Sequence, residues 1–301
     1  MKSFLFEKYG YYPDELINNK FFYNGFEFNL VPVDFDNDAI EELNFISNKI
    51  NETFNEGAFF VKTRKNEFIS FDGEQRYVLW TVKQGKQDIN KLIYLHKIFH
   101  NNLTNQRVVI NDLIELWEEK FEFIETKVIP SLRNDDYDFN IILEGIYFAF
   151  GLAENAIQYL SDTKIDIGDE IINNTLAHKR LMDFDNSIFF DPFNLIIDSP
   201  LRDYAELYKM NKLTVDEVLR IFDYYNLSLA EISVFMARIL YPTKLFDVLE
   251  KHYIDRLDIK KEILDYRITC EMELMRIRNI HIALLKRYNI RPLFWLEKKP
   301  S

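Results

Sequence analysis

Residues that could do chemistry gather between positions 176 and 207. His178 is followed by three aspartates, Asp183, Asp185 and Asp191. An aspartate can take a proton from a hydroxyl group as a general base, and carboxylate oxygens are preferred ligands of Mg²⁺. Asp183 and Asp185 are therefore candidates for a catalytic base. Asp191 is a candidate for a catalytic group and for a metal ligand.

Charged residues directly after this stretch favour a structural role. Asp198 and Asp203 lie at the start of a helical pattern, where an aspartate can cap free backbone N–H groups. Arg180 and Arg202 can pair with such carboxylates. Asn155, on a preceding helix, can bond loop backbone. We predict that a shared structural cluster holds this loop: Asn155, His178, Arg180, Asp198, Arg202 and Asp203.

Size, composition and charge bound the possible functions. The chain has 301 residues, of which 48% are hydrophobic, so it can bury a large core in one or two domains. Its net charge of −12 and pI near 5.0 argue against nucleic acid as a partner, because such binding depends on clustered Lys and Arg. We expect a folded protein that binds no nucleic acid.

Cysteine and histidine usage indicates no metal site or disulfide. Cys270 is the only cysteine and lies in an apolar helical pattern, and the pair His96/His100 has no carboxylate at suitable spacing. The first residues do not resemble a signal peptide. No apolar stretch reaches the roughly 18 residues needed to cross a bilayer. We therefore expect a cytoplasmic protein without membrane insertion.

The first part of the chain mixes strand and helix signals. Residues Phe21–Val33 predict a hairpin whose turn contains Asn24-Gly25. A capping-box pattern at Asp38 and Glu41 predicts the start of one helix. Ala58–Thr63 and Arg76–Val82 then predict two strands on either side of residues 67–73. Residues 1–83 should thus form a small antiparallel sheet with one helix.

The rest of the chain has helical periodicity. Thr214 with Glu217, and Ser228 with Glu231, form two further capping boxes. Pro130 predicts the end of one helix. The predicted helices span Asp88–Phe99, Val108–Val128, Phe139–Leu160 as the central one, and Asp258–Tyr288, followed by an extended Pro292–Leu296.

Two motifs resemble a known family. Gly151-Leu-Ala-Glu-Asn-Ala-Ile-Gln-Tyr-Leu160 and Ile197-Asp-Ser-Pro-Leu-Arg-Asp-Tyr-Ala-Glu206 are similar to the spore-coat-associated kinase-like family of coat protein S and YutH, which is related to aminoglycoside and choline phosphotransferases. The resemblance implies an α+β, two-lobed protein-kinase-like fold. Residues 1–83 would be a reduced antiparallel-sheet N-lobe, and 84–301 a mainly helical C-lobe with a degenerate catalytic loop.

The resemblance also implies where phosphoryl-transfer groups should stand. The hairpin has one glycine, Gly25, where a glycine-rich turn should hold phosphates, and Lys62 is the remaining candidate for the nucleotide-binding lysine. Arg180 replaces the aspartate of the His-x-Asp motif. The magnesium-binding asparagine would fall at 185 or 186. Asp191 has the spacing of the metal aspartate, although the following Pro192 is typical of members that have lost it.

The leading hypothesis is a catalytically impaired kinase-like protein, a pseudokinase, that acts as a binding or assembly scaffold and needs no cofactor. Its implied partners are proteins such as spore-coat components, and its implied location is the cytoplasm or the spore coat. The alternative is a phosphotransferase with rearranged groups that uses Mg-ATP on a small hydroxylated or cationic substrate. A third possibility is a helical interaction protein that presents Ile263–Leu285 to a partner, although core packing also explains that stripe. The sequence leaves the oligomeric state open.

Overall fold

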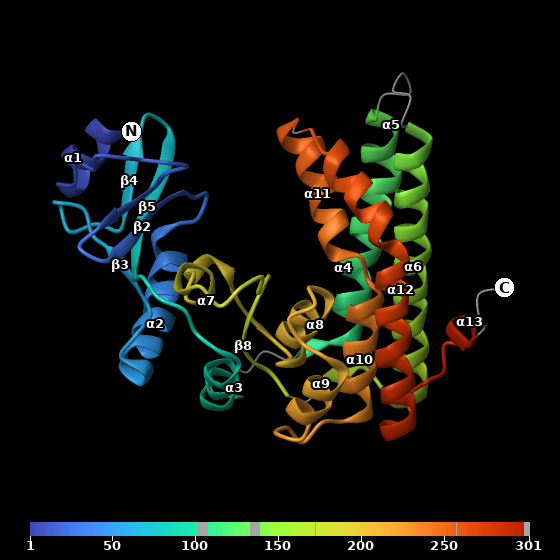
Figure 1. The fold of residues 1–301 in the computed structure, drawn as a ribbon. Helices are drawn as coiled ribbons and strands as arrows, with labels where there is room; N and C mark the ends of the chain where they lie inside the picture. Colours follow the sequence, from blue (N-terminus) through green and yellow to red (C-terminus); the bar gives the residue numbers. More distant parts are fainter. Residues whose placement is uncertain (101–107, 133–138, 172, 257, 298–301) are drawn as a thin grey trace. The chain divides into compact units, whose positions relative to one another are not determined.

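Two compact units make up the computed structural model, which describes residues 1–100, 108–132, 139–171, 173–256 and 258–297 (Figure 1). Unit 1 comprises residues 1–98 and 178–196, and unit 2 comprises residues 99–177 and 197–301. Residues 84–98 and the later loop 178–196 thus pack with the N-terminal sheet. The predicted domain boundary after residue 83 stays a prediction.

Unit 1 is built on an antiparallel sheet in the order β1-β2-β5-β3, with β4 also paired to β5. The predicted hairpin is confirmed, since Asn24 and Gly25 connect β1 and β2 with positive φ angles of 49° and 79°, as a tight hairpin turn requires. The stretch 67–73, predicted as a connection, contains a fourth strand. The strands are β1 Lys20–Tyr23, β2 Phe26–Pro32, β3 Ala58–Val61, β4 Ile69–Asp72 and β5 Gln75–Lys83.

The helices of unit 1 pack around this sheet. Helix α1, Lys2–Tyr9, was not predicted and buries Phe4 and Leu5 against Phe21 and Phe28. Helix α2, Asn37–Phe54, contacts β3. Its N-cap is Asp36, which accepts from the Ala39 amide at 3.0 Å, so the predicted start at Asp38 is wrong by two residues. The remaining helices are α3 Ile89–Ile98, α7 Asn186–Phe189 and the 3₁₀ turn η2 Pro192–Asn194.

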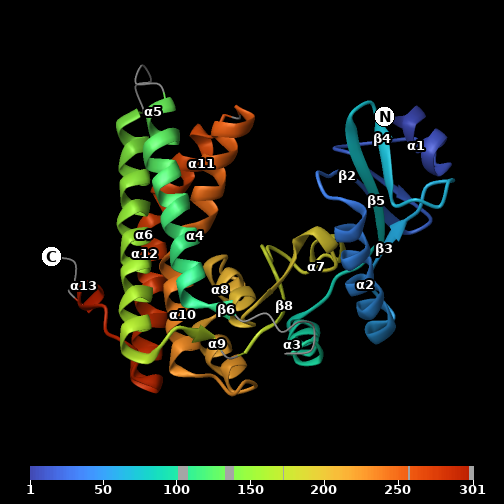
Figure 2. The same cartoon turned by 180° about the vertical axis from the view of Figure 1, so that it is seen from behind.

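Unit 2 is a helical bundle whose long helices lie side by side in both views (Figures 1 and 2). Helix α6, Phe139–Ile167, contacts α4, α10 and α12, as a central helix should. The helices are α4 Ile110–Phe123, the π turn η1 Ile124–Val128, α5 Ile129–Ser131, α8 Leu201–Lys209, α9 Val215–Phe222, α10 Leu229–Leu240, α11 Thr243–Asp255, α12 Lys260–Tyr288 and α13 Phe294–Glu297. None of the described helices is both long and apolar enough to cross a bilayer.

Local signals account for most boundaries in unit 2. Both capping boxes are present, with Thr214 and Ser228 accepting from the N3 amides of α9 and α10. The predicted extended segment Pro292–Leu296 is wrong, because Phe294 begins the short helix α13. Four short strands complete the unit and its junction with the loop: β6 Val108–Val109, β7 Glu170–Ile171, β8 Thr175–His178 and β9 Leu195–Asp198.

Candidate functional site

The loop 178–196, which runs from the last residue of β8 into β9, holds five of the ten predicted site residues, namely His178, Arg180, Asp183, Asp185 and Asp191. His178 begins it and is fully buried. Its Nε2 lies 2.8 Å from the carbonyl oxygen of Phe189, and since a carbonyl only accepts, this nitrogen carries the proton. The histidine therefore ties the start of the loop to α7.

Asn194, which the sequence did not single out, closes the loop. Its Nδ2 donates to the Arg180 carbonyl at 2.8 Å, and its Oδ1 accepts from the Arg180 amide at 3.0 Å. The Lys179 amide donates to the Asn194 carbonyl at 2.6 Å. Arg180 thus fixes the loop through its backbone. The predicted pairing of Arg180 with Asp198 would join the two units and stays a prediction.

Both candidates for a catalytic base share one lysine. The Lys86 ammonium lies 2.7 Å from Asp183 and 3.6 Å from Asp185. The hydrogen bond with Asp183 is the main cause that raises the pKa of Lys86, and Asp185 adds to it. Lys86 is exposed, so these pairs are individually weak. They nevertheless place a cation beside the two carboxylates that would have to accept a proton.

Asn186 occupies the place expected for a magnesium-binding asparagine, and its amide is used internally. Nδ2 donates to the Lys83 carbonyl at 2.9 Å, and Oδ1 accepts from Gln87 Nε2 at 2.7 Å. The side chain is only 5% exposed, and its backbone amide donates to the Gly85 carbonyl. Asn186 therefore binds the segment that leaves β5.

Asp191 is the N-cap of η2. Its Oδ1 accepts from the Phe193 amide at 3.0 Å. Burial raises the pKa of this carboxyl above its usual range, although the Phe193 amide and the charges of Lys20 and Lys179 act in the opposite direction. Phe193, two residues later, stacks on Phe35 with ring centroids 6.3 Å apart. The aspartate thus caps a turn that is anchored by an aromatic side chain.

Two of the groups expected to hold a catalytic magnesium ion, Asn186 and Asp191, are engaged in contacts within the loop and with the segment after β5. Such an ion is bound by carboxylate and amide oxygens, and the Asn186 oxygen accepts from Gln87 here. Among the described residues no group of three or more His, Cys, Asp or Glu side chains is placed to hold a metal ion. Lys62, the nucleotide candidate, has its ammonium 4.8 Å from the centroid of the Phe68 ring.

The other predicted structural residues lie in unit 2. Asp198 is 5% exposed and pairs with Arg202 Nη1 at 2.6 Å and with Arg238 Nη2 at 2.7 Å. Burial opposes ionisation of Asp198, but the two guanidinium groups outweigh it and hold its pKa below the usual range. Asp203 is fully buried on α8. Asn155 donates to the Gly151 carbonyl of its own helix at 2.6 Å, and its predicted bond to the loop backbone stays a prediction.

Arg238 is the member of this cluster that sequence reasoning missed. It lies on α10, whose residues from Ala230 to Leu240 are all buried. An arginine in such an apolar helix could have indicated a buried ion pair from the sequence, because an arginine is buried only when a carboxylate or several acceptors accompany it. Asp198 provides that carboxylate.

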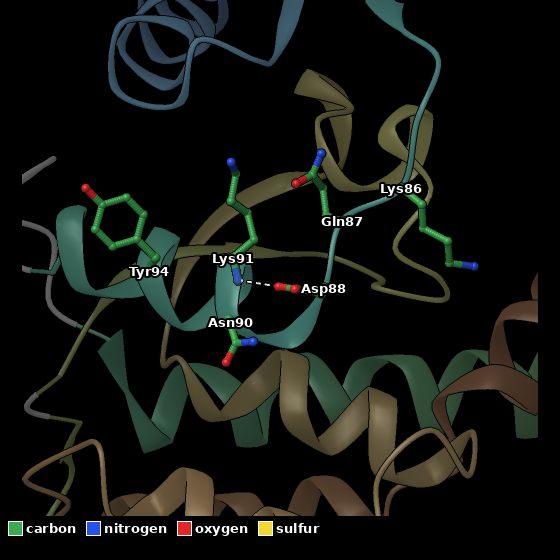
Figure 3. A pocket seen from close by; sticks show the side chains of 6 residues that line it. All are labelled: Lys86, Gln87, Asp88, Asn90, Lys91 and Tyr94. Carbon is green, nitrogen blue, oxygen red and sulfur yellow. Dashed lines mark hydrogen bonds between the residues drawn. The ribbon is translucent and has the colours of Figure 1, made fainter.

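A polar pocket of about 410 Å³ lies at the start of α3 in unit 1. Asp88 caps the helix by accepting from the Lys91 amide at 2.8 Å. Figure 3 shows Gln87, Lys91 and Tyr94 on one side, while Lys86 extends away from them. The lining side chains of Lys91 and Gln87 are bound to Glu56. The pocket has no apolar side chain except the Tyr94 ring, unlike the lining typical of small-molecule sites.

One protein family and two solved structures resemble this chain. The family model described as "Spore coat putative kinase YutH" matches residues 2–276. The structure of spectinomycin phosphotransferase, APH(9)-Ia, in complex with ADP and spectinomycin is similar with a TM-score of 0.55 at 11% identity, covering 93% of this chain and 92% of that chain. The predicted protein-kinase-like fold is thereby confirmed.

A second structure, an aminoglycoside phosphotransferase from Alicyclobacillus acidocaldarius subsp. acidocaldarius DSM 446, has a TM-score of 0.48 at 13% identity and covers 91% of this chain and 93% of that chain. No curated protein sequence matches the chain.

Proposed function

The chain belongs to the YutH family of spore coat kinase-like proteins, and we propose that it acts there as a binding or assembly scaffold instead of transferring phosphate. The observation that carries the proposal is that the side-chain amide of Asn186 is engaged in internal hydrogen bonds. In an active phosphotransferase this position binds the metal ion that neutralises phosphate charge. Here both polar atoms of the amide hold the segment that follows β5, at 2.9 and 2.7 Å.

The carboxylates support the same conclusion. Asp183 and Asp185 share Lys86, and Asp191 caps η2 with a pKa that burial raises. Each group that could act as a base or a metal ligand therefore has a structural task. These contacts stabilise unit 1. Protein partners in the spore coat are the partners that the family description suggests.

Nucleotide binding gives the first test. A ligand that binds only the folded state raises the unfolding temperature by mass action. We expect the melting temperature to stay unchanged when ATP or ADP is added with or without Mg²⁺, while an active phosphotransferase run in parallel shifts. A magnesium-dependent shift that is lost in Asp191→Ala but kept in Lys62→Ala would overturn the proposal. It would favour the phosphotransferase with rearranged groups.

Genetic complementation gives the second test. In a spore-forming host that encodes this protein, a deletion strain would receive either the parent gene or the triple variant Asp183→Asn, Asp185→Asn, Asp191→Asn. The variant keeps the shape of the loop but removes every carboxylate that is a candidate for a base or metal ligand. We expect the variant to restore the protein composition of the coat as the parent does. Failure of a variant that accumulates normally would contradict the scaffold proposal.

A further inference from the structure

Helix α12 carries a line of apolar side chains that unit 2 leaves uncovered. Its buried face packs against the other helices through Ile263, Cys270, Ile277 and Leu284. The opposite face exposes four large apolar side chains to 75%, 59%, 63% and 47%, namely Ile268, Met272, Met275 and Ile282. A contiguous exposed line of this kind marks a contact surface, whereas single exposed apolar residues do not.

The spacing of these residues is that of a helix-pairing seam. Positions 268, 272, 275, 279 and 282 follow alternating steps of four and three residues, which is the spacing of the a and d positions in a heptad. Asn279, also exposed, occupies one of these positions. Methionine side chains are flexible and adapt to an apposed surface. The partner that fits such a seam is another α-helix.

Charges beside the seam indicate which helix this is. Glu271 and Arg278 flank it on one side, and neither has an ion-pair partner among the described residues. They are seven residues apart, about 10 Å along the axis, so they do not reach each other. Arg267 and Arg276, in contrast, are engaged within unit 2, by Glu144 and by the Lys209 carbonyl.

We propose that α12 pairs with α12 of a second copy of this chain, in antiparallel orientation about a two-fold axis between Met272 and Met275. Each Met272 then faces Met275 of the other copy, and each Glu271 faces Arg278 of the other copy, so the seam and its charges are self-complementary. A parallel pair would instead place Glu271 opposite Arg276, whose guanidinium also covers the Tyr208 ring. The pairing does not depend on the scaffold function.

Sedimentation of the full chain over a range of concentrations tests the seam. We expect a monomer–dimer equilibrium for the parent and a monomer for the double variant Met272→Glu, Met275→Glu. The control is Leu116→Glu, which places one glutamate at a 57% exposed apolar position of α4 and should associate like the parent. A parent that is monomeric at every concentration, or a double variant that still dimerises, would overturn the proposal.

Charge reversal tests the orientation. By symmetry, Glu271→Arg or Arg278→Glu alone creates two like-charge contacts, so we expect each to weaken the dimer about tenfold at low salt. The double reversal restores both pairs and should return the dissociation constant to that of the parent. Single reversals without effect, or a double reversal weaker than either single one, would exclude the antiparallel arrangement.

Discussion

At the scale of residues, the aspartates of the loop and its flanks have separate structural roles. Asp191 caps a turn, Asp183 and Asp185 share a lysine, and Asp198 lies between two arginines. Burial raises the pKa of Asp191, while Arg238 and Arg202 lower that of Asp198 in spite of its burial. Since these two pKa shifts have opposite signs, the two carboxyls should change the free energy of unfolding in opposite directions as the pH rises.

Replacing Asp191 should not destabilise the protein at neutral pH. A carboxyl whose pKa is raised by folding reduces stability as the pH rises from its unfolded value through its folded value. Asparagine keeps an oxygen for the Phe193 amide and carries no charge. We expect Asp191→Asn to equal or exceed the parent in free energy of unfolding at pH 7, by at most about 1 kcal/mol. The difference should shrink toward about pH 4. Urea unfolding at both pH values measures this, and a clear loss at pH 7 would refute it.

Removing Arg238 should have a large effect. It would leave the buried Asp198 with Arg202 alone, and breaking a buried ion pair from one side typically costs about 3–5 kcal/mol. Because a lowered pKa contributes stability above the unfolded value that is lost as the pH falls through the folded value, the cost of Arg238→Ala should decrease in acid. Urea unfolding at pH 7 is the measurement.

The control for that measurement is the double variant Asp198→Asn, Arg238→Met, which removes both charges and should be more stable than Arg238→Ala alone. Equal stability of the two variants would show that an uncompensated carboxylate is not the cause of the loss. Of this cluster, the sequence indicated Asp198 and Arg202 through the helix start that they share. It did not indicate Arg238, because the contact joins the end of strand β9 to helix α10, and these elements lie far apart in the sequence.

At the scale of elements, local patterns predicted most boundaries. The Asn24-Gly25 turn, the capping boxes of α9 and α10 and the long apolar periodicity of α6 and α12 are each contained in a short stretch of sequence. Helix α1 and strand β4 were not predicted because they are short, and packing against the sheet stabilises them more than their local sequence does. The predicted stripe from Ile263 to Leu285 proved to contain two faces, one buried and one exposed.

The two capping boxes provide a matched prediction. Glu217 lies at an exposed helix start, whereas Glu231 is fully buried and also accepts from the backbone and side chain of Asn173 at 3.1 and 2.9 Å. We expect Glu217→Ala to cost about 1 kcal/mol, as a lost cap does. Glu231→Ala should cost about 3 kcal/mol, because it also leaves buried donors unpaired. Equal losses in chemical unfolding would show that the Asn173 contacts contribute nothing.

At the scale of the whole molecule, the main difference from the predicted organisation is that unit 1 is formed by two separate stretches of sequence. Residues 178–196 return to it from a distant part of the sequence. Within it Asn186 bonds Lys83 and Gln87, and Phe193 packs on Phe60 with centroids 6.0 Å apart. Sequence periodicity does not reveal such long-range contacts, so the composition of the unit was not predictable from local signals.

A fragment of residues 1–98 should therefore not fold stably by itself. It keeps all five strands but lacks the loop that covers Phe60 and satisfies the backbone carbonyl of Lys83. We expect no cooperative unfolding transition by circular dichroism. A fusion that joins residues 1–98 to 178–196 through a flexible linker is the control and should regain one. A cooperative transition in the shorter fragment would show that the loop is dispensable.

The discontinuity also has a consequence for biosynthesis. The ribosome releases the sheet strands long before residues 178–196, and at elongation rates of roughly 5–20 residues per second the intervening hundred or so residues take roughly 5–20 s to translate. During that interval the core of unit 1 is incomplete, because the loop residues that pack on the sheet have not yet been translated. Chaperone binding to the emerging N-terminal segment, and synonymous codons that alter the pace of translation between the two parts, should therefore influence the yield of native protein.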